Sequence, residues 1–278
     1  MNPDCRRAVF ASFFHSTTDR RFNAPALFCL LLVASTANSA QPEPAGSGEL
    51  HTVSEVFSVK DDGRVMISNP YGSVRIRAVP LAATPEFRVV MQTAEDIDRP
   101  ADIRVDSLDD GVRLSIDPVA EGRLSAEHGF LRADFVVALP DRFALEVEMM
   151  DGGFTMHPAG YPVTLRARDA SLKLRTTGEL DVEVTDGHVV VQQGAGDAPL
   201  AGGRIQTSGA RVDVLGADIA RVNYKTLSGA AVTTDSAALL DARVRDGRVE
   251  RFIGNPDNPV LMIQTDHAPI RLVAEGIR

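Results

Sequence analysis

Residues 143–192 contain one short pattern written three times: Leu145-Glu-Val-Glu148 before Asp151-Gly152, Leu165-Arg-Ala-Arg168 before Asp169-Ala170, and Leu180-Asp-Val-Glu-Val-Thr185 before Asp186-Gly187. After each corner a second alternating run follows: Phe154-Thr-Met156, Leu172-Lys-Leu174 and Val189-Val-Val191. Alternation with a period of two places the apolar residues on one face and the polar ones on the other, which is typical of a half-buried strand. The repeating unit is therefore strand, tight corner, strand.

The pattern continues in weaker form toward the C-terminus, around Ser208-Gly209, Ser228-Gly229, Asp246-Gly247 and Asp266-His267. A strand-corner repeat of about 20 residues without helical segments indicates stacked β-structure, in which no copy buries its own apolar face. We therefore predict an all-β chain, a single-chain β-solenoid or β-roll of strand-corner-strand repeats. Residues 51–278 form its domain, with a less regular N-terminal part over 51–140 and regular repeats over 141–278.

The same Asp-Gly corners allow an alternative, because Asp-Gly between alternating runs is also the strongest short hairpin signal. Hairpins would give an antiparallel β-sandwich. The outward charges favour stacking. If successive copies stack, we expect one column of Glu146, Arg166 and Asp181 and another of Glu148, Arg168 and Glu183, each alternating acid, base and acid. Opposite charges on neighbouring strands stabilise a pairing and fix its register.

The N-terminus carries an export pattern. An apolar run over residues 26–34 follows Arg20-Arg21 and precedes small residues, and it is far shorter than the ~20 residues that cross a bilayer. We predict a signal peptide over residues 1–40 and a flexible tether over 41–50, rich in Pro, Gly and Ser. Cys5 and Cys29, the two cysteines of the chain, both lie in the leader, so the mature protein would contain neither a disulfide nor a membrane span.

The charge of the chain limits its partners. The net charge is −9. Removing residues 1–40 takes away four Arg and two Asp, which leaves 25 basic and 36 acidic residues and a net charge of −11. Such a surface repels phosphate backbones and anionic headgroups, so nucleic acid is not an expected partner.

The N-terminal part shows further strands and one prominent corner. Alternating runs occur at 53–59, 74–76, 87–93, 103–105, 112–116 and 135–139. Asn69-Pro-Tyr-Gly72 has Pro at the second and Gly at the fourth position, which predicts a type I turn. Three longer loops, 118–130, 193–203 and 252–259, are the places left for binding.

Several of these motifs carry a resemblance to a known family. Ile67-Ser-Asn-Pro-Tyr-Gly-Ser-Val-Arg-Ile76, the run Val136-Val-Ala-Leu-Pro140 leading into Leu145-Glu-Val147, and the repeated Asp-Gly or Ser-Gly corners are similar to the bacterial putative-adhesin family of envelope β-solenoid proteins. The resemblance covers residue 51 to the C-terminus. It implies a β-solenoid and an adhesin-like role, and it carries over no catalytic residue.

The search for chemistry gives no candidate site. The histidines at 51, 128, 157, 188 and 267 include no pair at a metal-ligand spacing, and no nucleophile elbow, phosphate loop or dinucleotide fingerprint occurs. The corner aspartates, Asp61-Asp62 and Asp109-Asp110 are explained as turn residues, whose side chains bond their own backbone. We therefore predict no catalytic, metal-binding or cofactor-binding residue and no cofactor.

These observations predict a non-enzymatic exported envelope protein, periplasmic or at the cell surface, that acts as a structural, adhesin-like or protein-interaction module. Its partner would be an envelope protein or a surface ligand. The alternative is a carbohydrate-binding or carbohydrate-active β-helix protein. With no Trp and only Tyr71, Tyr161 and Tyr224, the chain offers few rings for sugars to stack on. A third possibility is an apolar groove that carries lipid.

Overall fold

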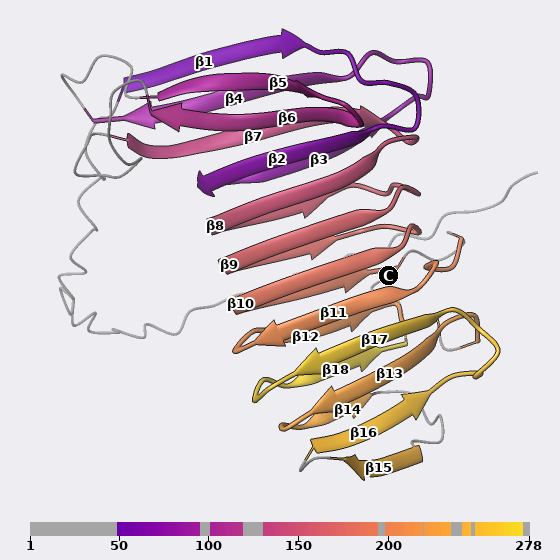
Figure 1. Ribbon diagram of the computed structural model, residues 1–278. Helices are drawn as coiled ribbons and strands as arrows, with labels where there is room; N and C mark the ends of the chain where they lie inside the picture. Colours follow the sequence, from indigo (N-terminus) through magenta and orange to yellow (C-terminus); the bar gives the residue numbers. More distant parts are fainter. Residues whose placement is uncertain are drawn as a thin grey trace, which may run out of the picture. The chain divides into compact units, whose positions relative to one another are not determined.

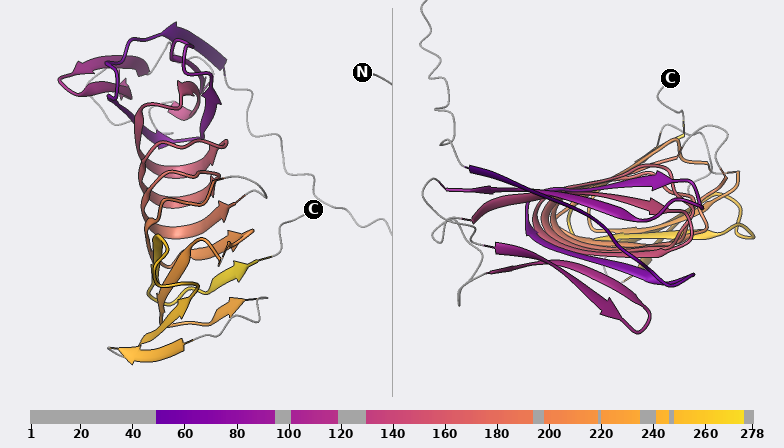
Figure 2. Two further views of the ribbon diagram at one scale, coloured as in Figure 1. Left: turned by 90° about the vertical axis from the view of Figure 1, so that its right-hand side faces the viewer. Right: turned by 90° about the horizontal axis from the view of Figure 1, so that it is seen from above.

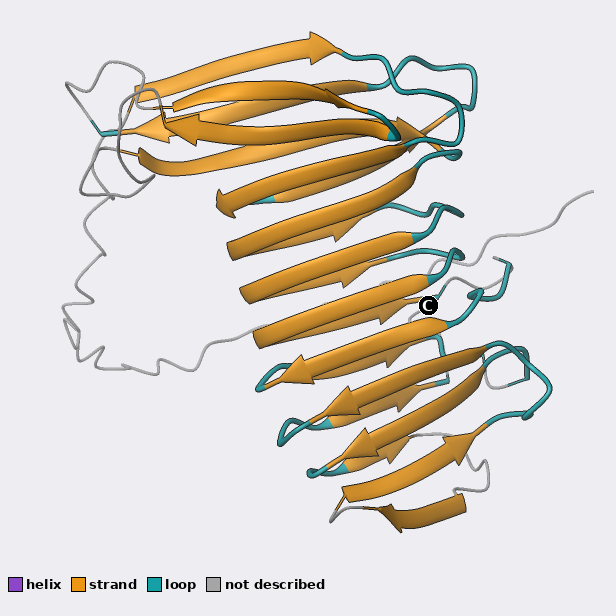
Figure 3. Cartoon of the chain, in the orientation of Figure 1, coloured by secondary structure: helices purple, strands orange, loops and turns teal. Residues whose placement is uncertain are grey.

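The computed structural model describes residues 49–94, 101–118, 130–193, 198–218, 220–234, 241–245 and 248–274. These residues form strands and connecting loops and include no helix, which confirms the all-β prediction (Figure 3). The predicted leader, residues 41–48 of the predicted tether, His128 and the corner at 246–247 lie outside the described residues, as do most of the 118–130 loop and residues 194–197 of the 193–203 loop.

The strands follow one another along the chain with short connections. The first ten are β1 (Glu49–Val56), β2 (Arg64–Tyr71), β3 (Val74–Val79), β4 (Glu86–Thr93), β5 (Ala101–Leu108), β6 (Gly111–Pro118), β7 (Phe130–Pro140), β8 (Ala144–Met156), β9 (Val163–Leu174) and β10 (Leu180–Gln192). The remainder are β11 (Gly203–Ser208), β12 (Arg211–Leu215), β13 (Asn223–Ser228), β14 (Val232–Thr234), β15 (Asp241–Arg245), β16 (Arg248–Ile253), β17 (Val260–Thr265) and β18 (Ile270–Val273).

The centre of the fold is the parallel stack of β8, β9 and β10 (Figure 1). Each of these long strands bends at its Asp-Gly or Asp-Ala corner and continues, so the chain does not turn back into a hairpin there. The halves before and after the bend belong to two layers. Seen along the stack, the successive strands superpose as a flattened loop (Figure 2, right).

The first layer contains the half-strands before the corner, and the second layer contains those after it. In the first layer β6, β2, β8, β9, β10, β11, β17 and β13 pair in parallel, one beside the next. In the second layer the parallel order is β7, β3, β8, β9, β10, β12, β18 and β14.

The stack does not follow the order of the chain throughout. The last pair of strands, β17 and β18, inserts between β11–β12 and β13–β14. The expectation that successive copies stack in sequence order is therefore wrong for the C-terminal copies. It holds for β8, β9 and β10, where Leu145, Leu165 and Leu180 lie on neighbouring strands.

Antiparallel strands finish both ends of the stack. At the N-terminal end β5 pairs with β6 in the first layer, while β1 pairs with β4 and β4 with β7 in the second. At the C-terminal end β16 pairs antiparallel with β13 and with β15. The sequence repeat around 246–247 is thus flanked by an antiparallel pair, and the prediction that it forms another stacked corner is wrong.

The core lies between the two layers and consists of columns of apolar side chains. In the first layer one column contains Ile67, Val147, Leu165, Val182, Ile205 and Ile263, all fully or almost fully buried. In the second layer Val74, Phe154, Leu172, Val189, Val212 and Ile270 form an equivalent column. Each column places a branched or aromatic side chain against its neighbour, which fills the interior at every level.

The interior becomes polar near the corners of the C-terminal copies. Thr207, Thr265 and Ser228 occupy one buried column. Thr265 Oγ1 donates to Ala268 O at 2.7 Å and lies 2.8 Å from Ser228 Oγ, and Thr207 Oγ1 donates to Ala210 O at 2.8 Å. These bonds satisfy buried hydroxyls that would otherwise cost folding free energy. They also tie each corner to the strand that precedes it.

The Asn69-Pro-Tyr-Gly72 corner differs from its prediction. Residues 69–71 continue β2, and the chain bends at Gly72, whose φ is 120°. The Gly72 N–H donates to Asp151 O of the neighbouring strand at 2.9 Å, where a type I turn would bond it to Asn69. Asn69 is buried and its side-chain amide donates to Ala133 O at 3.0 Å. The type I turn prediction is therefore wrong, because stacking on β8 takes the bond that would close the turn.

Glycine at the corner is required by this stacking. Gly152 has a φ of 134°, and a Cβ atom there would lie 1.8 Å from Gly72 O on the adjacent strand. The following residue, Gly153, has no such restriction, because the nearest atom to its Cβ position is Ser171 O at 3.9 Å. The two neighbouring glycines therefore separate the requirement of the corner from the general effect of replacing glycine.

We predict that Gly152→Ala destabilises the protein by at least about 1–3 kcal/mol, because it adds backbone strain and a steric clash at the corner. Gly153→Ala is the matched control and should leave stability within about 1 kcal/mol of wild type. Urea denaturation followed by circular dichroism measures both values. Equal stability of the two variants would show that corner stacking does not restrict position 152.

Candidate functional site

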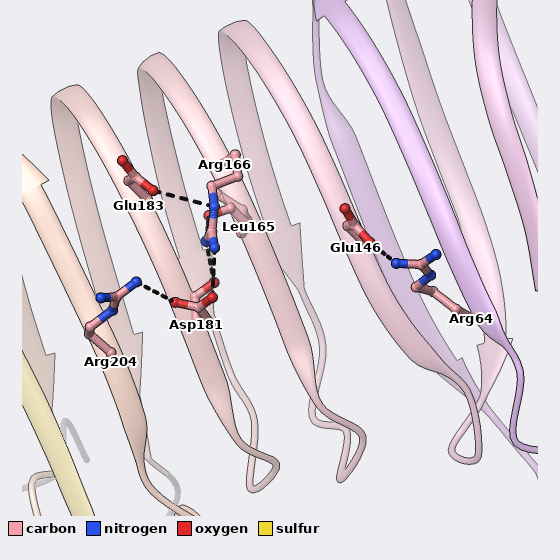
Figure 4. Close-up of polar contacts among 7 residues, drawn as sticks. All are labelled: Arg64, Glu146, Leu165, Arg166, Asp181, Glu183 and Arg204. Atoms are coloured by element: carbon pink, nitrogen blue, oxygen red, sulfur yellow. Dashed lines mark hydrogen bonds and ion pairs between the residues drawn. The ribbon is translucent and has the colours of Figure 1, made fainter. Parts of the chain in front are cut away.

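The outward side of the first layer carries most of the polar interactions between strands. We call this surface the charged face and define it by the outward residues Arg64 of β2, Glu146 and Glu148 of β8, Arg166 of β9, Asp181 and Glu183 of β10, and Arg204 of β11. Their alternation with buried apolar residues directs them all to one side of the layer. Figure 4 shows six of these seven side chains extending toward one another across neighbouring strands.

The register of the charged face differs from the predicted columns. Glu148 pairs with Arg166, and Arg166 with Glu183, while Thr164 lies between Glu146 and Asp181. The predicted columns are therefore wrong in the position of β9, which is displaced by two residues. The face is unchanged, because a shift of two residues preserves the alternation. The acid, base, acid sequence survives in the column of Glu148, Arg166 and Glu183.

Arg166 is the centre of the interactions. Its Nη2 donates to Asp181 Oδ2 at 2.6 Å and its Nη1 to Asp181 O at 3.1 Å, while Nε lies 3.4 Å from Glu183 Oε2 (Figure 4). Arg204 contacts the other carboxylate oxygen of Asp181 at 3.5 Å. The Arg166 hydrogen bond, followed by the charges of Arg166 and Arg204, lowers the pKa of Asp181 below its ordinary value, against the opposing effect of burial.

A second group on the charged face joins β2 to β8. Arg64 Nη1 donates to Glu146 Oε2 at 2.8 Å, and Nη2 lies 3.0 Å from Asp110 Oδ2 in the β5–β6 turn. Arg64, Arg166 and Arg204 are thus engaged by carboxylates of the chain itself. The charged face is a network of internal pairs that fixes the register of the strands.

Shallow hollows lie between these pairs. One of about 360 Å³ has apolar walls from Met149, Met150 and Ala167, with a rim from Glu148, Arg166, Arg168, Glu183 and Thr185. A second, of about 560 Å³, lies around Asp181, Arg204, Val260 and Met262. A third, of about 290 Å³, is polar and is lined by Ser68, Arg104, Asp106, Arg113, Ser115, Asp117 and Glu148.

A separate polar cluster occupies the outward side of the second layer. Asp213 is buried, and its carboxylate accepts from Arg211 Nε and lies close to His188 Nε2, both at 2.9 Å. The sequence placed His188 at an exposed corner and did not pair it. The register would have found this cluster, because His188 pairs with Arg211 across β10 and β12. We interpret the cluster as an ion pair that joins two stacked strands.

The turn residues considered as candidate carboxylates are dispersed. Asp61 and Asp110 form ion pairs with Arg142 and Arg64, respectively. Asp62, Asp169 and Asp186 adopt positive φ, as expected of Asp at a tight corner. No group of three or more His, Cys, Asp or Glu that could hold a metal ion occurs within the part of the chain that the structure describes.

The tyrosines do not form a common surface. Tyr161 and Tyr224 are buried and Tyr71 is half-buried. Burial raises the pKa of Tyr224 to about 12 and that of Tyr161 further still. The Tyr224 hydroxyl donates to Gln193 Oε1 at 3.0 Å and accepts from Asp218 N at 3.1 Å. This confirms that Tyr224 points inward, where its hydroxyl anchors the loop that follows β12.

The described part of the 252–259 loop is ordered by local contacts. Ile253 is fully buried, and Asn258 Nδ2 donates to Ala220 O at 2.7 Å. Asn255 Oδ1 accepts from Asp257 N at 3.0 Å, which closes a turn. In the 193–203 loop, Leu200 is buried and Gly202 and Gly203 adopt positive φ beside β10 and β17. These described portions serve the packing of the stack.

Over the described ranges, the structure contains no helix long and apolar enough to cross a bilayer. No protein-family model and no curated protein matches the sequence.

Solved structures with a similar fold share little sequence with this chain. A putative adhesin from Parabacteroides merdae matches at 13% identity with a TM-score of 0.41, over 83% of this chain and 98% of that one. A putative cell adhesion protein from Clostridium sporogenes matches at 11% identity and 0.38, over 81% and 99%. A putative lipid binding protein from Parabacteroides distasonis matches at 10% identity and 0.29, over 82% and 98%. These values assign neither a family nor an activity to this chain.

We predict that Arg166→Gln lowers stability at neutral pH by roughly 0.2–1 kcal/mol, because the ion pairs of Arg166 are partly exposed. Asp181 has a lowered pKa in the folded state, so its contribution exists above the ordinary Asp pKa of about 3.9 and disappears as the pH falls through the lower folded value. The difference between wild type and Arg166→Gln should therefore shrink below pH ~4. Urea denaturation at a series of pH values measures it.

Arg168→Gln is the control for this experiment. Arg168 lies two residues further along β9 on the same face, and its register partner on β10 is the uncharged Thr185. This variant should change stability less at neutral pH and without the same pH dependence. If both variants respond alike to pH, the register network does not depend on Arg166.

Proposed function

We propose that the chain is an exported envelope protein whose β-solenoid of about 20-residue repeats acts as a non-enzymatic structural, adhesin-like or protein-interaction module. The repeat pattern, the leader predicted over residues 1–40 and the resemblance of residues 51–278 to the putative-adhesin family support this proposal. The parallel, in-register stacking of β8, β9 and β10 fits the solenoid interpretation. A stacked architecture of this kind presents long, rigid surfaces suited to binding.

One observation carries the protein-interaction function. The 360 Å³ hollow on the charged face combines apolar walls with a charged rim. The side chain of Met150 stands there with 45% of its surface exposed, although it is large and apolar. An apolar centre surrounded by polar residues is the usual anatomy of a protein interface, and methionine adapts its shape to a partner. The site therefore favours a protein partner over a small charged ligand.

A photo-crosslinking amino acid at position 150 tests this function. In cells that produce the protein, we expect a discrete adduct with a second envelope protein from position 150. The same amino acid at Lys173, which is exposed on the second layer of β9, is the control and should give no such adduct. The double change Arg166→Gln and Glu183→Gln would alter the rim and should reduce the yield from position 150. Equal labelling from both positions, or none from position 150, would refute the charged face as the binding surface.

The polar hollow of about 290 Å³ favours carbohydrate as a second candidate. Asp106, Asp117 and Glu148 bring carboxylates together with Arg104 and Arg113, and such groups form bidentate hydrogen bonds with sugar hydroxyls. Arg104 Nη2 holds Asp117 Oδ2 at 2.7 Å, which fixes one side of the hollow.

Incubation with a panel of envelope and host polysaccharides tests this alternative. Binding would raise the melting temperature of wild type and leave Asp117→Asn unaffected, and hydrolysis would appear as shortened products. Asp102→Asn, on the same edge strand outside the hollow, controls for loss of charge. The absence of a shift and of products for every glycan would eliminate the carbohydrate function while leaving the crosslinking result untouched.

A further inference from the structure

Strand β1 forms the N-terminal edge of the second layer. Among the described residues it pairs with one strand, β4, along its whole length (Figure 1). Phe57 N donates to Pro85 O at 3.1 Å just beyond the end of β1 and in the same register. Because hydrogen-bonded pairs alternate in an antiparallel ladder, the odd-numbered residues of β1 bond to β4. The N–H and C=O groups of Leu50, Thr52, Ser54 and Val56 therefore point to the open edge.

This edge lacks the features that usually prevent strands from pairing. Within Glu49–Val56, all of which is described, there is no Lys, no Pro and no bulge. Leu50 and Val56 are 65% and 67% exposed, the two most exposed large apolar side chains of the described chain. Both lie near the ends of the strand, on the face that carries Thr52 and Ser54.

The sequence of β1 is complementary to itself when read in opposite directions. We propose that β1 pairs antiparallel with β1 of a second copy of this chain, with Val53 on the two-fold axis. Leu50 then lies opposite Val56 of the second copy, Thr52 opposite Ser54, and His51 opposite Glu55. Every position meets a chemically matched one: apolar with apolar, hydroxyl with hydroxyl, and imidazole with carboxylate.

The hydrogen-bond pattern of the edge selects this register. Only residues of even number offer their backbone groups, so even residues must lie opposite even residues, which excludes every pairing displaced by one. A displacement by two in one direction would place Glu49 opposite Glu55, two like charges. In the other direction it would place Val53 opposite Glu55. The register centred on Val53 leaves no mismatch, and it supplies about eight backbone hydrogen bonds.

The geometry also accounts for a symmetric dimer of limited strength. A two-fold axis through Val53 makes the contact isologous and closed, so pairing ends at two copies. A single strand edge buries less area than the ~1,200 Å² of a typical stable interface. The dimer is therefore expected to dissociate on dilution, and its formation does not depend on the function proposed for the charged face.

A disulfide across the axis tests the register directly. In the full chain with Cys5 and Cys29 replaced by serine, Val53→Cys places two thiols opposite each other in a non-hydrogen-bonded pair, where Cα atoms lie about 4.5 Å apart. This distance suits a disulfide. We expect mild oxidation to produce the linked dimer in large excess over Thr52→Cys. Residue 52 is exposed, but its two copies would stand about 8 Å apart, beyond the reach of a disulfide.

Sedimentation of unmodified protein and of Thr52→Pro completes the test. Thr52 N–H points away from β4, so proline removes an edge donor without breaking the β1–β4 ladder. We expect a concentration-dependent dimer for wild type and a monomer for Thr52→Pro, with closely similar melting temperatures. A monomeric wild type, or crosslinking of Thr52→Cys as fast as that of Val53→Cys, would overturn the proposal.

Discussion

The structure depends on backbone hydrogen bonds between parallel strands held in one register from copy to copy. In β8, β9 and β10 every copy places its apolar residues on those of the copy before it, so Val147, Leu165 and Val182 form one column. No copy can bury this face alone, and the free energy of burial is gained only when neighbours stack. The corners follow from the same constraint, since Gly152 approaches the backbone of Gly72 too closely for any side chain. Corner residues and core residues thus meet one requirement.

The charges reinforce a register that the apolar residues leave ambiguous. A displacement by two residues keeps valine and leucine on the inner face, so packing alone distinguishes such registers weakly. Arg166, held by Asp181 at 2.6 Å and facing Glu183, loses its partners in a displaced register. The individual pairs contribute little because they are partly exposed. Their value lies in the difference between correct and displaced stacking.

The sequence contained the correct register as well as the elements. Alternation identified the strands, and the Asp-Gly corners located the bends. The predicted columns were wrong because the copies were aligned at their leading leucines. Aligned at their corners, Glu148, Arg166 and Glu183 each stand three residues before Asp151, Asp169 and Asp186, which is the observed register. The insertion of β17–β18 between β11–β12 and β13–β14 had no such signal. Every copy offers the same apolar face, so alternation cannot specify which copies become neighbours.

The internal pairing of the charges also decides what the charged face can do. An unpaired arginine or carboxylate would have to be desolvated by any partner that covered it, at a cost of several kcal/mol. On this face Arg64, Arg166 and Arg204 are already held by carboxylates at 2.6 to 3.5 Å. A partner covering the face would bury neutralised pairs together with the exposed apolar surface of Met150. A surface of this kind remains soluble without a partner and can still be covered by one, because the interactions that fix the register also reduce the cost of burial.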